Sequence, residues 1–155
     1  MTQDQGNEVP AGTVRTLARA ARMLERACEQ MSLAQYRMLA AVASGDEQAS
    51  RLALLLALSR PSVTAVVDAL VERGWLVRLP VPGDRRTMRI SVTPSGLEAL
   101  VVAEQQMGER LRAVLGRAED PAGVLAGLAG LGEALEAAAA ERVVVCKQPP
   151  PKVRT

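Results

Sequence analysis

The apolar residues of this chain recur at helical spacing along most of its 155 residues, and the spacing changes to every second residue only between residues 76 and 92. Apolar positions three and four residues apart form one side of an α-helix, whereas strict alternation is typical of a half-buried strand. The alternating stretches are Leu76–Leu79 and Met88–Val92. The pattern therefore predicts a mostly α-helical fold with one small β-hairpin.

Capping residues divide the helical part of the chain. Ser32, with Gln35 three residues later, has the spacing of a capping box, and Gly45 and Gly74 follow predicted helices where a C-terminal cap is expected. Three further helix starts combine a capping side chain with a proline in the first turn, and the capping residues are Ser59, Thr93 and Asp120. These signals predict at least five helices.

Two of these helices are adjacent and joined by a tight turn. The first is expected at 49–57, and the second begins near Arg60 with a small polar face at its N-terminus. A basic hairpin follows, with a Pro-Gly turn and paired arginines near its tip. A helix-turn-helix followed directly by such a hairpin is a winged helix-turn-helix.

The chain accordingly divides into four segments. An N-terminal amphipathic helix is expected at 13–31, the winged helix-turn-helix at 32–96, and two C-terminal helices at 97–145. The last segment, 146–155, is proline-rich and polar, and we expect it to be disordered.

Missing residue types exclude most enzyme classes. The chain has no histidine, so it has no Ser-His-Asp triad, histidine base or histidine-bound metal. Its cysteines, Cys28 and Cys146, are too far apart in sequence for a Cys-x-x-Cys metal site, and no P-loop motif occurs. We expect no catalysis, metal or cofactor. With no signal peptide and no uninterrupted apolar run above seven residues, we expect a cytoplasmic protein without a membrane partner.

Basic residues concentrate in the middle of the chain. The formal charge is only +2, but residues 51–89 hold seven arginines and three acidic residues, a local charge of +4, against −2 for the remainder. A basic centre between neutral or acidic ends is typical of a nucleic-acid-binding module flanked by oligomerisation segments.

Residues 32–100 resemble the multiple-antibiotic-resistance regulator (MarR) family of bacterial transcription factors. The matching stretches are Ser32–Leu39, Arg51–Ser59, Arg60–Gly74, Asp84–Arg86 and Val92–Gly96. Two departures concern Ala57, where the family often has glycine, and Ala65 and Ala69, where it often has longer polar residues.

The resemblance implies a homodimeric winged-helix regulator of transcription that binds double-stranded DNA. We expect a repressor that recognises an inverted-repeat operator and is released by a small-molecule effector or an oxidant. The first helix and the last two helices of each subunit would interlock in the dimer. The apolar stripe within 14–31 and the glycine-rich stretch at 121–135 fit that role, although a stripe of this kind can also face an intramolecular core.

The recognition helix is expected near 60–73, with its N-terminal end in the major groove. The residues of the two helices expected to meet DNA are Arg51, Arg60, Pro61, Ser62, Thr64 and Ala65. Both arginines can reach phosphates, and Ser62 and Thr64 can donate to phosphates or base edges. Pro61 and Ala65 offer only apolar contact, so base readout by this helix should be modest.

In the wing, Arg86 resembles the minor-groove arginine of the family, with Asp84 orienting it and Arg85 meeting phosphate. The alternative is that Asp84 and Arg86 form only a solvated pair at the hairpin tip. We also expect Asp68 to pair with an arginine rather than face DNA.

Several residues have two interpretations. Cys28 is either a small packing residue or a redox-sensing thiol, and Trp75 either caps the core or forms a stacking platform. Tyr36 and Arg37 are candidates for an effector site between the dimer helices and the wing domain. An exposed Leu54–Leu55 pair would instead favour a winged helix that binds protein and not DNA.

Overall fold

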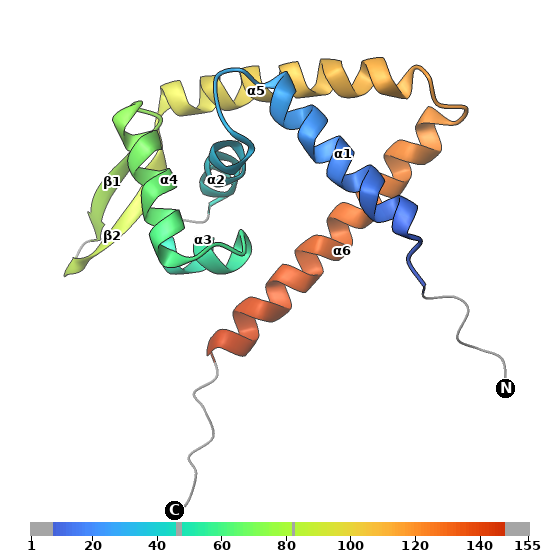
Figure 1. The fold of residues 1–155 in the computed structure, drawn as a ribbon. Helices are drawn as coiled ribbons and strands as arrows, with labels where there is room; N and C mark the ends of the chain where they lie inside the picture. Colours follow the sequence, from blue (N-terminus) through green and yellow to red (C-terminus); the bar gives the residue numbers. More distant parts are fainter. Residues whose placement is uncertain (1–7, 46–47, 82, 148–155) are drawn as a thin grey trace, which may run out of the picture.

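The computed structural model describes residues 8–45, 48–81 and 83–147, with the side chains of 84–87 and 142–147 left out of the description. The elements follow one another along the chain as six helices and one hairpin (Figure 1). Their bounds are α1 Ala11–Ala27, α2 Leu33–Ala43, α3 Ala49–Leu55, α4 Arg60–Glu72, β1 Leu76–Val81, β2 Asp84–Val92, α5 Pro94–Leu115 and α6 Pro121–Lys147. The mostly helical fold with a hairpin wing, predicted from the sequence, is confirmed.

The predicted caps form in the structure. The Ser32 hydroxyl accepts from the Gln35 backbone N–H at 3.2 Å, and the Gln35 side chain accepts from the Ser32 N–H at 2.9 Å. At the other predicted starts a side-chain oxygen also accepts from a backbone N–H three residues on. These capping residues are Ser59, Thr93 and Asp120. Local capping chemistry therefore fixes where four of the six helices begin.

The core is built almost without aromatic rings. Its fully buried large side chains come from α2, α3, α4 and β1, and they are Met38, Leu39, Leu52, Val63, Val67, Leu70 and Leu76. From α5, Ala103 and Met107 close the same cluster. Because small side chains let helices approach closely, a winged-helix core of leucine, valine, alanine and methionine can reach full packing density.

The hairpin is longer than predicted. Leu76 pairs with Val92 and Pro80 with Met88, and the register shifts between Pro80 and Val81. Ile90 is buried, as predicted for the inward face, but Met88 is 44% exposed because it lies beyond the edge of the core. The outer part of the wing therefore projects past the domain, next to α4 (Figure 1).

The first helix ends earlier than predicted. The apolar stripe extends to Met31, yet α1 stops at Ala27, and Cys28 has an extended backbone. Both Cys28 and Met31 are nevertheless buried in the core, so the packing interpretation of Cys28 is supported. An N-cap needs non-helical backbone, so the chain must leave the helix before Ser32. Periodicity cannot distinguish a helix from a non-helical segment that buries the same side chains.

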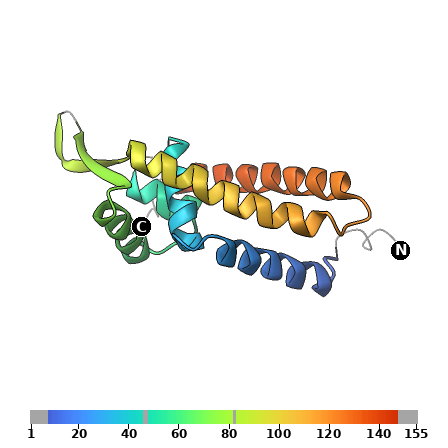
Figure 2. The same ribbon diagram turned by 90° about the horizontal axis from the view of Figure 1, so that it is seen from above.

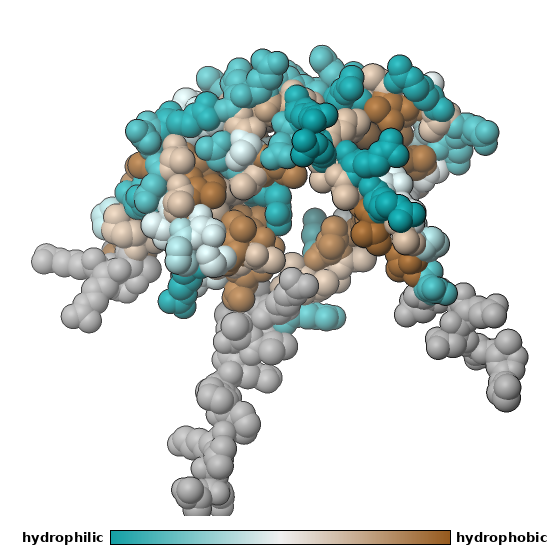
Figure 3. All heavy atoms as spheres, viewed as in Figure 1, coloured by the Kyte–Doolittle hydropathy of each residue, from teal (hydrophilic) through white to brown (hydrophobic). Residues whose placement is uncertain are grey.

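Helices α1, α5 and α6 form an arm on one side of the winged helix, in which α5 leads away to a turn and α6 runs back until it contacts α3 (Figures 1 and 2). Large apolar side chains are exposed along α1 and α6, and they are Val14, Leu17, Val124, Leu125, Leu128, Leu131 and Leu135. In Figure 3 the upper surface along α5 is largely hydrophilic, whereas apolar residues gather below it. A single chain therefore leaves this apolar surface in water, where it is unfavourable.

The segment Pro121–Glu141 of α6 is long and apolar enough to cross a membrane by length and composition, and none of it is buried within the described chain. The length of the longest uninterrupted apolar run did not reveal this apolar helix, because glycines interrupt the run without adding polar side chains. Apolar helices of soluble proteins pass the same test. The result therefore shows that α6 has an apolar surface to bury, but it does not show whether protein or lipid buries that surface.

Ala57 has a left-handed backbone conformation, with φ of 52°. Its N–H donates to Leu54 and the N–H of Leu58 donates to Ala53, which is the Schellman arrangement that ends α3. The equivalent position after α4 is Gly74, with φ of 72°. Glycine tolerates this conformation, whereas a Cβ makes it costly.

We therefore expect Ala57→Gly to stabilise the protein by about 0.5–1 kcal/mol, because relief of the left-handed strain exceeds the added flexibility of the unfolded chain. Urea unfolding followed by circular dichroism measures the change. The reverse experiment, Gly74→Ala, should lower the free energy of unfolding. A destabilised Ala57→Gly variant would contradict this account of the turn.

Candidate nucleic-acid interface

Helices α3 and α4 form the helix-turn-helix. The chain bends by 111° between them, within the range of this motif. The α3 helix is shorter than the predicted 49–57, because Leu56 and Ala57 belong to the turn. The Arg37 side chain donates to the Leu56 carbonyl at 3.2 Å, so α2 supports the turn directly. Contacts with α2, on the buried side of the motif, thus set the orientation of α4.

The inner face of α4 is buried and its outer face is exposed. Val63, Val67 and Leu70 are at most 1% exposed. All the residues of this helix predicted to meet DNA are exposed on the other side of its first two turns, and they are Arg60, Pro61, Ser62, Thr64 and Ala65. Arg51 of α3 is exposed as well. The structure therefore brings the predicted helix residues onto one accessible surface.

Hydroxyl groups at this helix start are already engaged with the local backbone. The Ser59 hydroxyl caps the Ser62 N–H and lies 2.8 Å from the Ser62 hydroxyl. Thr64 donates to the Arg60 carbonyl at 3.1 Å. These bonds fix the orientation of the hydroxyls while leaving them at the surface. A shallow hollow of about 220 Å³ separates the starts of α3 and α4, and Ser50, Arg60 and Thr64 lie in its wall.

The electrostatics of this surface favour an anion. The first turns of α3 and α4 contain no acidic residue, and the N-terminus of a helix carries partial positive charge. Farther along α4, Asp68 pairs with Arg78 of β1 at 2.5 Å, as predicted. This pair neutralises the carboxylate nearest the exposed face. Both side chains are well exposed, so the pair contributes little to stability.

The C-terminal end of α4 has a structural role. Arg73 donates to the Gln30 carbonyl at 2.6 Å, and its guanidinium lies 3.8 Å from the centre of the Trp75 ring. Trp75 is half-buried against the core, which supports its interpretation as a capping residue. Sequence reasoning missed the role of Arg73, since nothing in the local pattern identifies a bond to a carbonyl 43 residues away.

The wing lies beside this surface. The β1–β2 hairpin and the N-terminal part of α4 lie at the same end of the molecule, opposite the turn that joins α5 to α6 (Figure 1). Asp84, Arg85 and Arg86 begin strand β2, but their side chains lie outside the described part of the structure. Their contacts with DNA therefore stay predictions.

Tyr36 and Arg37 lie on α2, where the winged helix meets the arm. The Tyr36 hydroxyl donates to a Glu104 carboxylate oxygen of α5 at 3.5 Å. Burial first, and the Glu104 charge second, raise the pKa of Tyr36 above its usual 10.0. Together with the Arg37–Leu56 bond, this contact couples α2 to both neighbouring helices. The predicted effector role of these two residues stays untested.

The Leu54–Leu55 pair is not exposed as predicted. Both residues are half-buried, and Leu55 packs against the core. The seven-residue helix α3 also contacts α6, so it has apolar neighbours on more than one side within the chain. One feature that favoured a protein-binding winged helix is therefore absent, and the modest base readout expected of the recognition helix is the feature that remains.

Comparison with known proteins agrees with this geometry. Residues 29–87 match the model of the MarR family. The chain is 29% identical over 135 residues to the HTH-type transcriptional regulator PecS of Dickeya dadantii, covering 71% of this chain and 81% of PecS. Among solved structures, a mutant of Escherichia coli MarR in complex with operator DNA superposes with a TM-score of 0.63 at 23% identity, covering 83% of this chain and 97% of that one. Rhodococcus jostii CouR bound to p-coumaroyl-CoA superposes with a TM-score of 0.67 at 19% identity, covering 89% of this chain and 96% of that one.

Proposed function

Since the chain belongs to the MarR family, we propose that it is a cytoplasmic transcriptional repressor that binds an inverted-repeat operator as a homodimer and has no catalytic activity. The observation that carries this proposal is the one-sided burial of α4. Its inner face is locked into the core, while its N-terminal outer face is exposed, free of acidic residues in the first turn and flanked by a basic wing.

In this proposal the N-terminal turns of α4 enter the major groove. Arg60 and Arg51 contact phosphates on either side of the groove. Ser62 and Thr64 offer hydroxyl oxygens, and Pro61 and Ala65 contact thymine methyl groups. Apart from the two arginines, which are assigned to phosphates, no side chain here has the guanidinium or amide group that reads a base pair through two hydrogen bonds. Sequence preference therefore depends strongly on DNA shape.

The wing supplies the second contact. Arg86 would enter the minor groove, Asp84 would orient its guanidinium, and Arg85 would meet phosphate. A narrow, A·T-rich minor groove concentrates negative potential, so an inserted arginine senses its width. The structure of the MarR mutant in complex with operator DNA, which has the same fold, supports DNA binding by this chain.

A second copy of the chain is the proposed cover for the apolar arm. Val14 and Leu17 of α1 are 58% and 45% exposed, and Leu128 and Leu131 of α6 are 41% and 40% exposed. Interlocking arms would bury these side chains and would also hold two recognition helices at a fixed separation. The same contact explains why a helix as apolar as α6 can belong to a protein that works on DNA.

A small-molecule effector would act where the winged helix joins the arm. Tyr36 and Arg37 already bond to Glu104 and to the end of α3, so a ligand that displaced either bond would shift α4 relative to the arm. CouR, which has the same fold, binds p-coumaroyl-CoA, and this supports the binding of a small-molecule effector by the present chain. Because Cys28 is only 7% exposed, an effector fits better than direct oxidation of this thiol.

Binding to duplex DNA of random sequence tests the proposal, measured by fluorescence anisotropy at several salt concentrations. We expect affinity to fall steeply with salt, because each neutralised phosphate releases counterions. Arg86→Ala should weaken binding by about 1–3 kcal/mol per lost contact, with the larger loss on A·T-rich duplexes. Melting temperature and mass should not change, because the residue lies near a hairpin tip.

Arg112→Ala is the matched control, since it removes the same charge from an exposed position on α5 in the arm. It should change DNA affinity little. Equal losses in the two variants would contradict the wing assignment, and salt-independent or absent binding by the unmodified protein would contradict DNA binding itself.

The dimer gives a separate prediction. Leu128→Glu places a charge on the exposed apolar side of α6 and should convert the dimer to a monomer or an aggregate. Ala129→Glu adds the same side chain on the side of the helix that holds Glu133 and Glu136, and it should preserve the dimer. Light scattering coupled to size exclusion gives the masses. A stable dimer in the Leu128→Glu variant would refute the interlocking arms.

A further inference from the structure

The side of α4 that points away from the core has only short apolar side chains in its first two turns. Val63, Val67 and Leu70 define the buried side of the helix. With about 100° between successive residues, four exposed residues lie opposite them, and they are Pro61, Ala65, Asp68 and Glu72. We call these four residues the outer ridge of α4. The first half of the ridge is apolar and the second half is acidic.

Short side chains allow the start of α4 to come close to the edges of the bases. Pro61 and Ala65 project little beyond the helix backbone, and they lie four residues apart on the same side of the helix. Beyond them, Asp68 and Glu72 carry the same sign of charge as DNA, although Arg78 pairs with Asp68. Close approach is therefore confined to the first two turns, the part of a recognition helix that meets base edges.

Thr64 adds a hydrogen-bond acceptor beside the two apolar residues. It is exposed, and its hydroxyl donates to the Arg60 carbonyl at 3.1 Å. A threonine hydroxyl has one proton and two lone pairs, so a hydroxyl that has donated to its own helix can only accept from DNA. In the major groove such an acceptor favours the amino groups of adenine and cytosine over the carbonyl groups of guanine and thymine.

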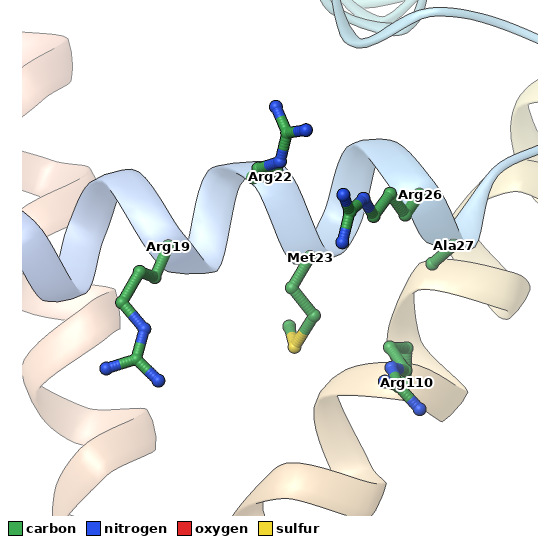
Figure 4. A pocket seen from close by; sticks show the side chains of 6 residues that line it. All are labelled: Arg19, Arg22, Met23, Arg26, Ala27 and Arg110. Atoms are coloured by element: carbon green, nitrogen blue, oxygen red, sulfur yellow. The ribbon is translucent and has the colours of Figure 1, made fainter.

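A cluster of long cationic side chains lies on the arm instead. Arg19, Arg22 and Arg26 of α1 and Arg110 of α5 are exposed around a hollow between these two helices (Figure 4). On α4 itself, the proposed function assigns Arg60 to phosphate. Base readout by α4 therefore depends on the short side chains of its first two turns.

The chemical groups that fit this surface are a methyl group and an amino group on one base pair. In the major groove a T·A pair presents the C5-methyl group of thymine and the amino group of adenine, whereas a C·G pair presents the amino group of cytosine alone. Methylation of cytosine at C5 adds a methyl group at the same ring position as in thymine. A pair of 5-methylcytosine with guanine therefore offers α4 the same two groups as a T·A pair.

We propose that the outer ridge of α4 recognises the C5-methyl groups of pyrimidines, so that the protein binds DNA containing 5-methylcytosine more tightly than unmethylated DNA of the same sequence. This inference rests on the proposed DNA binding. Pro61 and Ala65 are the specificity-determining residues, and Thr64 accepts from the neighbouring amino group. Methylation of an operator then changes its occupancy without any change of base sequence.

Fluorescence anisotropy on four related duplexes tests the proposal. The full chain first selects a duplex from a pool of random sequence, and each thymine of that duplex is replaced in turn by uracil to find where a methyl group contributes. At such a position the four duplexes carry T·A, U·A, 5-methylcytosine·G or C·G. We expect T·A to bind more tightly than U·A, and 5-methylcytosine·G more tightly than C·G, each by about fourfold, the factor that corresponds to burial of one methyl group.

Substitutions on α4 assign the effect to the outer ridge. Ala65→Gly removes the side chain that contacts the methyl group, and it should reduce the factor to below about twofold. Ala69→Gly has the same cost in helix propensity at a half-buried position of the same helix, and it should leave the factor unchanged. Circular dichroism melts show whether each variant is folded at the temperature of the measurement.

Two further variants separate the methyl contact from the other DNA contacts. Arg86→Ala should weaken binding of methylated and unmethylated duplexes equally, because C5-methyl groups lie in the major groove and Arg86 is assigned to the minor groove. Thr64→Val keeps the shape of the side chain and removes the acceptor. It should weaken all four duplexes by a similar factor, since each of them presents an amino group.

Three results would overturn the proposal while leaving DNA binding in place. The first is a selected duplex in which no replacement of thymine by uracil weakens binding, and the second is equal binding of the 5-methylcytosine·G and C·G duplexes. The third is a methyl effect of the same size in the unmodified protein and in Ala65→Gly. Failure of the protein to retain any duplex from the random pool would instead contradict the proposed function, and this inference with it.

Discussion

Burial of one side of α2 is the contact on which the rest of the structure depends. Met38 and Leu39 of this helix are completely buried, and α2 contacts α3, α4, α5 and the second strand. From its polar side, Arg37 holds the end of α3 and Tyr36 reaches Glu104 of α5. One eleven-residue helix therefore sets the position of the recognition helix, the wing and the arm together. Disruption of its packing would displace all three.

The composition of the core has a consequence for the surfaces. With no phenylalanine and a single tryptophan, the winged helix closes its core with aliphatic and methionine side chains from α2, α3, α4, both strands and α5. Although α3 contacts α6, the winged helix leaves most of the apolar surface of α6 uncovered. The winged helix thus buries its apolar side chains within one chain, whereas the arm leaves many of them exposed. The proposed function uses this difference, with DNA contact assigned to the winged helix and association to the arm.

Much of the winged helix could be predicted from the sequence, because its signals are local. Ser32, Ser59 and Thr93 cap the helices that they were expected to cap, and Gly74 has the predicted left-handed conformation. The end of α1 could not be predicted in this way. Cys28 and Met31 continue the helical spacing but are buried from a non-helical segment, so the same pattern fits two backbone conformations.

The candidate sites divide in the same manner. The exposed face of α4 followed from periodicity, since the buried valines determine which residues must point outward. Contacts between residues far apart in sequence could be predicted less well. Asp68 was expected to pair with an arginine, but its partner Arg78 was not identified. The bond from Arg73 to the Gln30 carbonyl was not expected at all.

Footprinting the protein on the chromosomal fragments that it retains is the most direct test of the proposed dimer on DNA. Two recognition helices held by interlocked arms require half-sites about one helical turn apart, roughly 10 bp, related by a two-fold axis. We expect protection of an imperfect inverted repeat with this spacing. Protection of a single half-site, or of direct repeats, would contradict the two-fold arrangement of winged helices.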